Sequence, residues 1–324
     1  MATAVLGLAA TAGLVLILDP AQVGHAMTLF PLGFIPAIVA LYLAIYALQG
    51  LRWHYLLRDA GARLKVSDSL LLNAAGQTIT ALVPLGDLTR AALASEASGR
   101  EFGTLAATVT VQELTFNLML VLCALPVMLE FGHGITLVVA TLLTMAAITL
   151  ILTVSPIFRV VHDLVAHIPL LNRLLPAIEE LQAETASLLH TPDALWLSVL
   201  DLLRALVSIA AFWLVVEGFS PGVIDERKAA FVLAVSSIGG AISLIPGGVG
   251  ANEASVAGLL IVFGVTDGPA GAAALIQRFL MTAMAIGLGL AAYAVVRRRF
   301  KLGGIFQLIS RPQGETNAGR RAPG

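Results

Sequence analysis

The sequence predicts an all-α polytopic membrane protein, because its composition, its long apolar stretches and two broken apolar segments agree on that class. Of its 324 residues, 58% are hydrophobic and only 12% are charged. The mean hydropathy is +0.92, which lies outside the range of soluble domains. We expect about six spanning helices plus two oppositely oriented re-entrant broken helices in an inverted repeat, or eight spans if the broken segments are counted as spans.

The first part of the chain predicts two spanning helices followed by a basic loop. Residues 1–18 are apolar but lack the basic start of a signal peptide, and a second apolar stretch covers 31–50. Residues 52–65, RWHYLLRDAGARLK, are rich in Lys and Arg and contain Trp53 and Tyr55. Cytoplasmic loops carry an excess of Lys and Arg, and aromatic residues gather at membrane interfaces. We therefore expect a cytoplasmic loop here.

The remaining apolar stretches predict the other spans. They are long enough to cross a bilayer and cover about 104–129, 135–155, 194–218 and 270–296. A polar section, 156–193, contains an amphipathic segment that we expect to lie along the membrane surface. We assign residues 1–301 to one integral membrane domain and 302–324 to a polar cytoplasmic tail.

Two apolar segments are interrupted by proline and glycine. They are residues 81–90, ALVPLGDLTR, and 243–253, SLIPGGVGANE. An interrupted backbone at bilayer depth is tolerated only where protein or a water-filled cavity satisfies its polar groups. The residues expected to break the helices are Pro84, Gly86, Pro246, Gly247, Gly248 and Gly250.

The charges that follow the two breaks indicate a repeat. Arg90 follows the first break and Glu113 lies on the next apolar helix, whereas Glu253 follows the second break and Arg278 lies on the last helix. The order is therefore the same with the signs exchanged. We assign the half-repeats to about 66–130 and 229–296. Discontinuous helices at corresponding positions of two halves are typical of transporters.

The distribution of Lys and Arg predicts the orientation. If each broken segment returns to the side from which it enters, the three spans between them make the first open from the cytoplasm and the second from outside. Most of the 19 Lys and Arg residues then lie in cytoplasmic segments, and only Arg227 and Lys228 lie outside. We expect a multi-pass protein of the cell inner (plasma) membrane with both termini in the cytoplasm.

Charged side chains inside the predicted membrane domain are the candidate functional residues. Each costs about 2.5 to 3.5 kcal/mol at a helix centre, so each needs a partner or a function. Asp201 and Arg204 lie three positions apart and are expected to neutralise one another. The predicted substrate-binding residues are Asp87, Arg90, Gln112, Glu113, Asn252, Glu253, Gln277 and Arg278.

Spacing leaves the pairing of these charges open. Arg90 could pair with Glu113 and Glu253 with Arg278 inside each half-repeat, or the pairs could form across the halves. We expect the two arginines to bind an anionic phosphate group together with free backbone N–H groups after the breaks. The alternative is that the pairs only hold the broken helices in place. Further polar residues that suit a cavity wall are Asn73, Gln77, Thr78, Thr80 and Asn117.

Signatures of soluble enzymes are missing from the sequence. The segment 247–253, GGVGANE, begins like a dinucleotide fingerprint but has Glu253 where a third glycine belongs and no βαβ context. The six histidines lack metal-ligand spacing, and the single cysteine, Cys123, excludes an intrachain disulfide. We expect no cofactor, no metal site, no catalytic residues and no nucleic-acid partner.

The two broken segments resemble the lysylphosphatidylglycerol synthase transmembrane-region family. The similarity rests on LVPLGDLTRAAL and on LIPGGVGANEASVAGLL with the later Gln-Arg, and it covers about residues 1–300. Asn252 departs from the family, which often has arginine before the glutamate. The matching positions are Pro84, Gly86, Asp87, Arg90, Pro246, Gly247, Gly248, Gly250 and Glu253.

The resemblance implies a lipid-handling membrane protein, with a flippase as the leading function. The lipid would be a phospholipid, an aminoacylated lipid or an isoprenoid-linked lipid, and its anionic headgroup would be the binding partner. Aminoacyl transfer belongs to a separate soluble domain in bifunctional members, so a lipid-modifying enzyme would be another polypeptide here. The alternatives are a membrane subunit or enzyme of lipid-headgroup modification, and a structural membrane scaffold.

Overall fold

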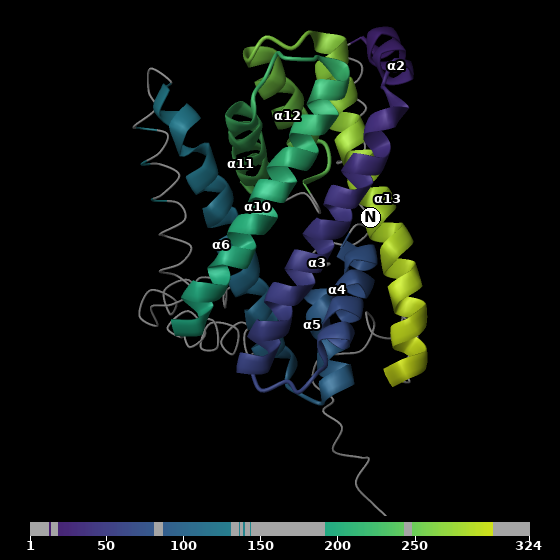
Figure 1. Cartoon of the computed structure of the whole chain (residues 1–324), viewed down its shortest axis with the longest axis vertical. Helices are drawn as coiled ribbons and strands as arrows, with labels where there is room; N and C mark the ends of the chain where they lie inside the picture. The colour runs from purple at the N-terminus through teal and green to yellow at the C-terminus, as the bar shows by residue number, and fades with distance from the viewer. Residues whose placement is uncertain are drawn as a thin grey trace, which may run out of the picture.

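The protein is a bundle of helices. The computed structural model describes residues 19–80, 87–130, 192–242 and 248–300, together with the single positions 13, 136, 139 and 143. Every regular element in these ranges is a helix (Figure 1). Four helical stretches in the described part are long and apolar enough to cross a membrane: Leu32–Asp59, Phe102–Glu130, Leu197–Phe219 and Asp267–Phe300. The prediction of an all-α membrane protein is confirmed.

The bounds of the long described helices lie within a few residues of the predicted apolar stretches, except that the stretch predicted at 31–50 continues as a helix to Asp59. The predicted spans at 1–18 and 135–155 and the amphipathic segment within 156–193 fall outside the described residues. In chain order the elements are α2 (Pro20–Thr28), η1 (Leu32–Phe34), α3 (Ile35–Asp59), α4 (Val66–Thr80), α5 (Asp87–Ser98), α6 (Phe102–Glu130), α10 (Pro192–Phe219), α11 (Glu226–Ile242), α12 (Ala251–Val262) and α13 (Asp267–Phe300).

The basic loop was predicted to begin at residue 52, and this predicted start was wrong. Helix α3 continues to Asp59, and Arg52 and Trp53 are fully buried in it. Gly50 lies inside α3, and its lack of a side chain permits close packing. A Cβ there would lie 2.7 Å from Leu70 Cδ2, so this glycine lets α4 pack closely against α3. Arg52, which was expected in the loop, thus belongs to the interior of the protein.

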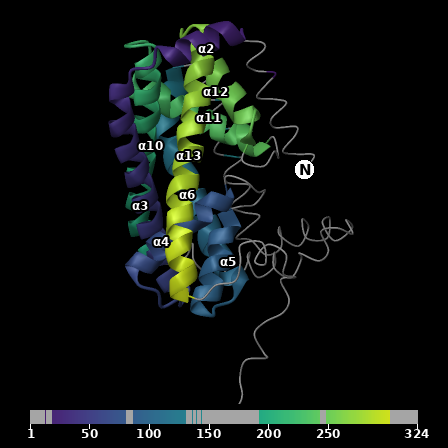
Figure 2. The same ribbon diagram turned by 90° about the vertical axis from the view of Figure 1, so that its right-hand side faces the viewer.

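Short helices form two pairs at opposite ends of the bundle. Helices α4 and α5 pack against each other, as do α11 and α12. Figures 1 and 2 show the first pair at the end opposite to α2 and the second pair at the same end as α2. The long helix α13 runs the length of the molecule beside both ends, and it packs against α4 and α12.

The start of α12 depends on two glycines with positive φ. Gly248 has φ 63° and Gly250 has φ 85°, a region that side chains strongly disfavour. Gly250 is the residue before α12, and its backbone N–H donates to Glu253 Oε2 at 2.5 Å. Gly248 and Gly250, which the sequence predicts as helix breakers, directly precede α12. The break residues Pro84, Gly86, Pro246 and Gly247 lie outside the described residues.

A polar layer separates two apolar clusters along the bundle. In α6, Leu105 and Val109 belong to one cluster, whereas Leu120 and Val121 belong to the other. The intervening turns carry buried polar residues such as Gln112. Glu113 and Arg204 therefore lie near the middle of the long helices α6 and α10.

Candidate functional site

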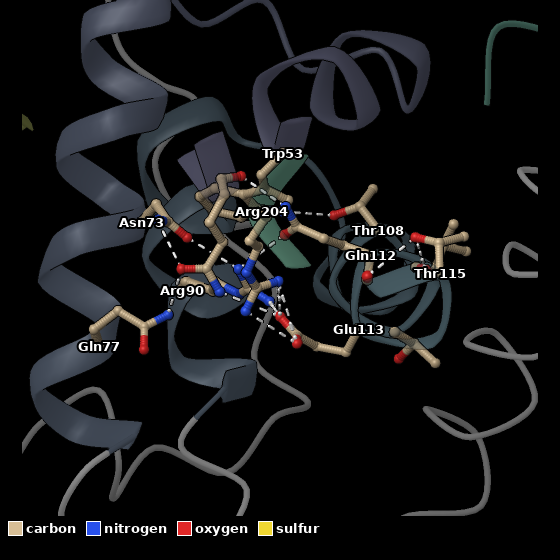
Figure 3. Close-up of polar contacts among 12 residues, drawn as sticks. Trp53, Asn73, Gln77, Arg90, Thr108, Gln112, Glu113, Thr115 and Arg204 are labelled. Carbon is tan, nitrogen blue, oxygen red and sulfur yellow. Dashed lines mark hydrogen bonds and ion pairs between the residues drawn. The ribbon is translucent and has the colours of Figure 1, made fainter. Parts of the chain in front are cut away.

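Arg90 is the centre of the first polar cluster. Its Nη1 donates to Asn73 Oδ1 and Gln112 Oε1, both at 2.9 Å, and its Nη2 donates to Glu113 Oε1 at 2.7 Å (Figure 3). The guanidinium also lies 5.6 Å from the ring centre of Trp53. A buried arginine with this many partners is held in one position.

A glycine on α4 allows Arg90 to come this close. A Cβ on Gly76 would lie 2.5 Å from Arg90 Cβ. Helix α5 therefore packs directly on the backbone of α4 at this point, and the arginine side chain extends past it toward α6. Any larger side chain at position 76 would push α5 away.

Glu113 is shared by two arginines from different helices. Arg204 on α10 approaches it with three hydrogen bonds of 3.3, 3.4 and 3.4 Å. These are longer than the 2.7 Å bond from Arg90. The Arg204 guanidinium also lies 3.8 Å from the ring centre of Phe116. Glu113 is therefore the shared counterion of two guanidinium groups.

Gln49 joins three helices in the same cluster. Its Oε1 accepts from Asn73 at 3.2 Å and from Gln77 at 3.1 Å, and its Nε2 donates to Glu113 at 3.2 Å. Its backbone carbonyl accepts from Gln112 at 2.6 Å. This one residue on α3 therefore connects α4 and α6, and it is almost fully buried.

The residues Asp201 and Arg204 do not pair as their spacing predicted. Asp201 Oδ2 accepts from Arg52 Nε at 3.0 Å and from Thr115 Oγ1 at 2.6 Å, whereas Arg204 contacts Glu113. Both residues lie on one helix, but each contacts a different neighbouring helix. The expectation of an ion pair between Asp201 and Arg204 was therefore wrong, because each side chain pairs with a residue of another helix.

The second half contains a pair on α12 and α13. Arg278 Nε lies 3.2 Å from Glu253 Oε1, and the Glu253 side chain is 3% exposed. The spacing left open whether the pairs form inside each half or across the halves. The structure pairs Arg90 with Glu113 and Glu253 with Arg278. Each pair forms inside its own half of the chain.

A cavity of about 200 Å³ lies between these two polar clusters. The described wall residues come from seven helices, including α4 and α12 from the two short-helix pairs. Arg204 is the charged residue among its described lining residues. Its polar lining consists of Tyr42, Tyr46, Gln49, Gln77, Arg204, Ser208, Ser236, Ser237, Asn252 and Gln277.

A second, much smaller space adjoins the cavity on the α12 side. Its volume is about 10 Å³, and Glu253 and Arg278 line it together with Asn252 and Gln277. This is about the space of one water molecule. Asn252 and Gln277 belong to the walls of both spaces, so they separate the Glu253 and Arg278 pair from the larger cavity.

The structure places the predicted substrate-binding residues in two groups, and their binding role stays a prediction. Arg90, Gln112 and Glu113 lie in the first cluster, and the four residues of α12 and α13 lie around the small space. Asp87 begins α5, and its side chain lies outside the described part. Among the side chains that are described, no three His, Cys, Asp or Glu residues come together as metal ligands.

Sequence reasoning assigned Arg204 to a local pair with Asp201, and it missed Gln49 and Arg52 as members of the site. Gln49 is a buried amide on an otherwise apolar stretch of α3. A single polar residue among apolar ones was the signal that could have identified it as a site residue. The partners of these residues lie 24 to 149 positions away in the chain, so spacing could not reveal them.

The fold and the site define an integral membrane protein with a charged polar layer beside an internal cavity. The model of the lysylphosphatidylglycerol synthase transmembrane region matches residues 4–289. The chain therefore belongs to this family. The family is named for the membrane part of a lipid-modifying protein, which ties the chain to membrane lipid.

A relative and the solved structures complete the comparison. A UPF0104 membrane protein from Methanothermobacter thermautotrophicus is 30% identical over 142 residues, which are 41% of this chain and 42% of that protein. The match thus spans less than half of either protein. No solved structure matches this chain.

Proposed function

We propose that the protein moves a lipid with an anionic headgroup between the two leaflets of the membrane. The observation that carries this proposal is the cavity in the polar layer, whose described wall contains one charged residue, Arg204. Guanidinium groups bind phosphate oxygens well, often with two parallel hydrogen bonds. The lipid headgroup would occupy the cavity while its acyl chains stay in the bilayer.

The proposed mechanism uses Glu113 as a replaceable counterion. In the empty site, Glu113 neutralises Arg204 through long hydrogen bonds of 3.3 to 3.4 Å. A phosphate entering the cavity would replace these bonds, and Glu113 would keep its short 2.7 Å bond to Arg90. The exchange leaves neither arginine without a counterion, which is necessary in a region of low dielectric.

We further propose that the two short-helix pairs are re-entrant hairpins in an inverted repeat. The supporting observations are the packing of α4 on α5 and of α11 on α12, and their location at opposite ends of the bundle in Figures 1 and 2. Each pair also contributes a wall residue to the cavity, Gln77 and Asn252. Transporters of this construction bind their substrate between the halves.

The proposed location is the cell inner membrane, with the termini in the cytoplasm. The basic last turn of α13, which carries Arg297, Arg298 and Arg299, supports that side because cytoplasmic ends are rich in Lys and Arg. A separate lipid-modifying enzyme is the proposed partner, since the family is named for a synthase.

The test is lipid movement in proteoliposomes. Wild-type protein should move fluorescent phosphatidylglycerol between leaflets, and Arg204→Gln, Arg90→Gln and Glu253→Gln should reduce the rate. The matched control is Arg58→Gln, because the Arg58 side chain is 58% exposed at the end of α3. It removes one positive charge without contacting the cavity and should keep the wild-type rate.

Folding must be matched before the rates are compared. Size-exclusion elution and thermal unfolding in detergent give that check for each variant. If the folded wild type moves neither phosphatidylglycerol nor any other phospholipid tested, the translocation proposal is wrong and the ion pairs serve only to hold the helices together.

A further inference from the structure

We propose that the acyl chains of the bound lipid leave the cavity beside Met281, through an opening that α13 presents to the hydrocarbon core of the bilayer. The inference rests on the proposed function and names the part of the lipid that this side of the cavity contacts. It follows from the position of Met281, which belongs both to the cavity wall and to the outer surface of the bundle.

The size of the cavity requires such an opening. Its volume is about 200 Å³, whereas an acyl chain of a membrane lipid reaches across about half of a hydrocarbon core that is about 30 Å thick. The cavity can therefore hold a headgroup but not the two chains attached to it. Chains that stay in the bilayer need a path that joins the headgroup site to the hydrocarbon, and apolar groups should line that path.

Met281 is the described lining residue that reaches the surface of the bundle. It is 48% exposed, and it lines both the cavity and the small space beside Glu253. Lining residues deeper in the bundle are buried: Gln49 is 3% exposed and Arg204 is 8% exposed. The cavity wall therefore meets the outer surface at Met281.

The opening lies at membrane depth, between the two short-helix pairs. Met281 lies near the middle of α13, a helix that is long and apolar enough to cross a membrane. Gln277, one turn earlier on the same face of α13, also lines the cavity. The helix runs from the α11 and α12 pair to α4 and α5 (Figure 2), and the pairs supply the cavity residues Asn252 and Gln77. A residue exposed at this depth contacts hydrocarbon.

The chemistry of the wall changes from the interior to the opening. Arg204, which is buried, presents a guanidinium group that binds phosphate oxygens well. Met281 at the opening is an unbranched apolar side chain, and its three rotatable bonds let it adapt to neighbouring hydrocarbon. A phospholipid has the same order of groups, because its phosphate is attached to the glycerol that carries the acyl chains. A phosphate at Arg204 therefore directs the chains toward Met281.

The first test narrows the opening without changing any charge. Met281→Trp places a large, rigid ring at the opening. It should slow the movement of fluorescent phosphatidylglycerol between leaflets by about tenfold, because added bulk in a confined space is costly. The matched control is Phe279→Trp. Phe279 is 64% exposed on the same helix, but two positions turn a helix by about 200°, so it faces another part of the bilayer. The control should keep the wild-type rate.

A photocrosslinking measurement on wild type keeps the test independent of variant folding. One probe is phosphatidylglycerol with a diazirine on its acyl chain, and the other is diacylglycerol with the same chain and no phosphate. Both probes should label Phe279 equally, because this residue contacts the bilayer in general. Phosphatidylglycerol should label Met281 at least about threefold more than diacylglycerol, since Arg204 retains only the phosphate-bearing lipid. Tandem mass spectrometry locates the adducts.

The outcomes separate the opening from translocation itself. If folded Met281→Trp moves lipid as fast as wild type, or if both probes label Met281 equally, the opening is wrong while translocation stands. If wild type moves no phospholipid, translocation is wrong. Preferred labelling of Met281 by phosphatidylglycerol would then still support the opening as a lipid contact, and equal labelling would overturn it as well.

Discussion

Two arginines share Glu113, and the unequal lengths of their bonds to it distinguish their functions. Arg90 makes short bonds to three side chains and is fully buried. Arg204 makes longer bonds to the same carboxylate and lines the cavity. At the scale of single residues, the proposed mechanism therefore uses Arg90 as a structural anchor and Arg204 as the arginine that exchanges its partner.

Replacing Glu113 should destabilise the protein more than replacing Arg204. Glu113→Gln leaves two guanidinium groups without their shared counterion and should lower the free energy of unfolding by about 3 kcal/mol, the lower end for a broken buried pair. Arg204→Gln leaves Glu113 paired with Arg90 and should cost about 1 kcal/mol. Denaturant titration in detergent micelles measures both values.

The double variant provides the control for this prediction. Glu113→Gln combined with Arg204→Gln removes one of the two unpaired cations, so it should be more stable than Glu113→Gln alone by about 1 kcal/mol. A double variant that loses the sum of both single effects would show that Glu113 and Arg204 do not interact energetically.

Helix α12 illustrates how an element boundary depends on backbone conformation. The backbone reaches Ala251 through Gly248 and Gly250, both with positive φ. Gly248 also packs against Gly240, because an added Cβ would lie 3.1 Å from the Gly240 Cα. Sequence alone identified these glycines as helix breakers, but it could not show that one of them also brings α11 and the start of α12 together.

Gly248→Ala should therefore destabilise the protein, by about 1 to 2 kcal/mol from the positive φ alone. The matched control is Gly258→Ala in the helix that follows, α12, where an added Cβ meets nothing within 4 Å. That control should be neutral or stabilising by up to about 1 kcal/mol, because alanine favours helix. Equal thermal stability of the two variants would contradict the structural requirement at Gly248.

The start of α11 provides a pH-dependent element. Asp225 Oδ1 accepts the backbone N–H of Lys228 at 2.9 Å, and this hydrogen bond is the main reason that the pKa of Asp225 lies below its usual value of 3.8. A carboxyl whose pKa is lowered on folding stabilises the fold above its unfolded pKa, and this contribution is lost as the pH falls through the folded pKa.

Asp225→Ala should consequently cost about 0.5 to 2 kcal/mol at pH 7, as for other helix N-caps. The difference from wild type should shrink as the pH falls below about 4, since the wild-type carboxyl then becomes protonated. Thermal unfolding of both proteins between pH 3 and 7 measures it. A difference that stayed constant over this range would mean that the charge of Asp225 does not contribute.

At the scale of the whole molecule, the proposed topology predicts which end is reached from outside. Glu101, before α6, and Glu226, at the start of α11, are exposed near opposite ends (Figure 1). In a Cys123→Ala background, a membrane-impermeant maleimide added to intact cells should label Glu226→Cys and leave Glu101→Cys unlabelled. Permeabilised cells, in which both should react, provide the control. The reverse pattern would invert the orientation.

The sequence was informative about elements and about pairs inside each half, and much less about contacts between distant helices. The spans that became α6, α10 and α13 were predicted because long apolar stretches need no tertiary information. The partners of Arg52 and Arg204 were not predicted, because a residue on a helix can face any of several neighbours. Local spacing assigned Arg204 to Asp201, whereas tertiary packing pairs it with Glu113.

The hydrogen bonds of Gln49 have a mechanical consequence. They fasten α3, α4 and α6 to one another at mid-height, so these helices are expected to move as one rigid block. Helix α11, in contrast, packs against α6 in an apolar cluster, and its Ser237 donates a long 3.4 Å hydrogen bond to Asn117 of α6. For the proposed lipid movement, we therefore expect the hinge that admits a headgroup to lie between this block and the α11 and α12 pair.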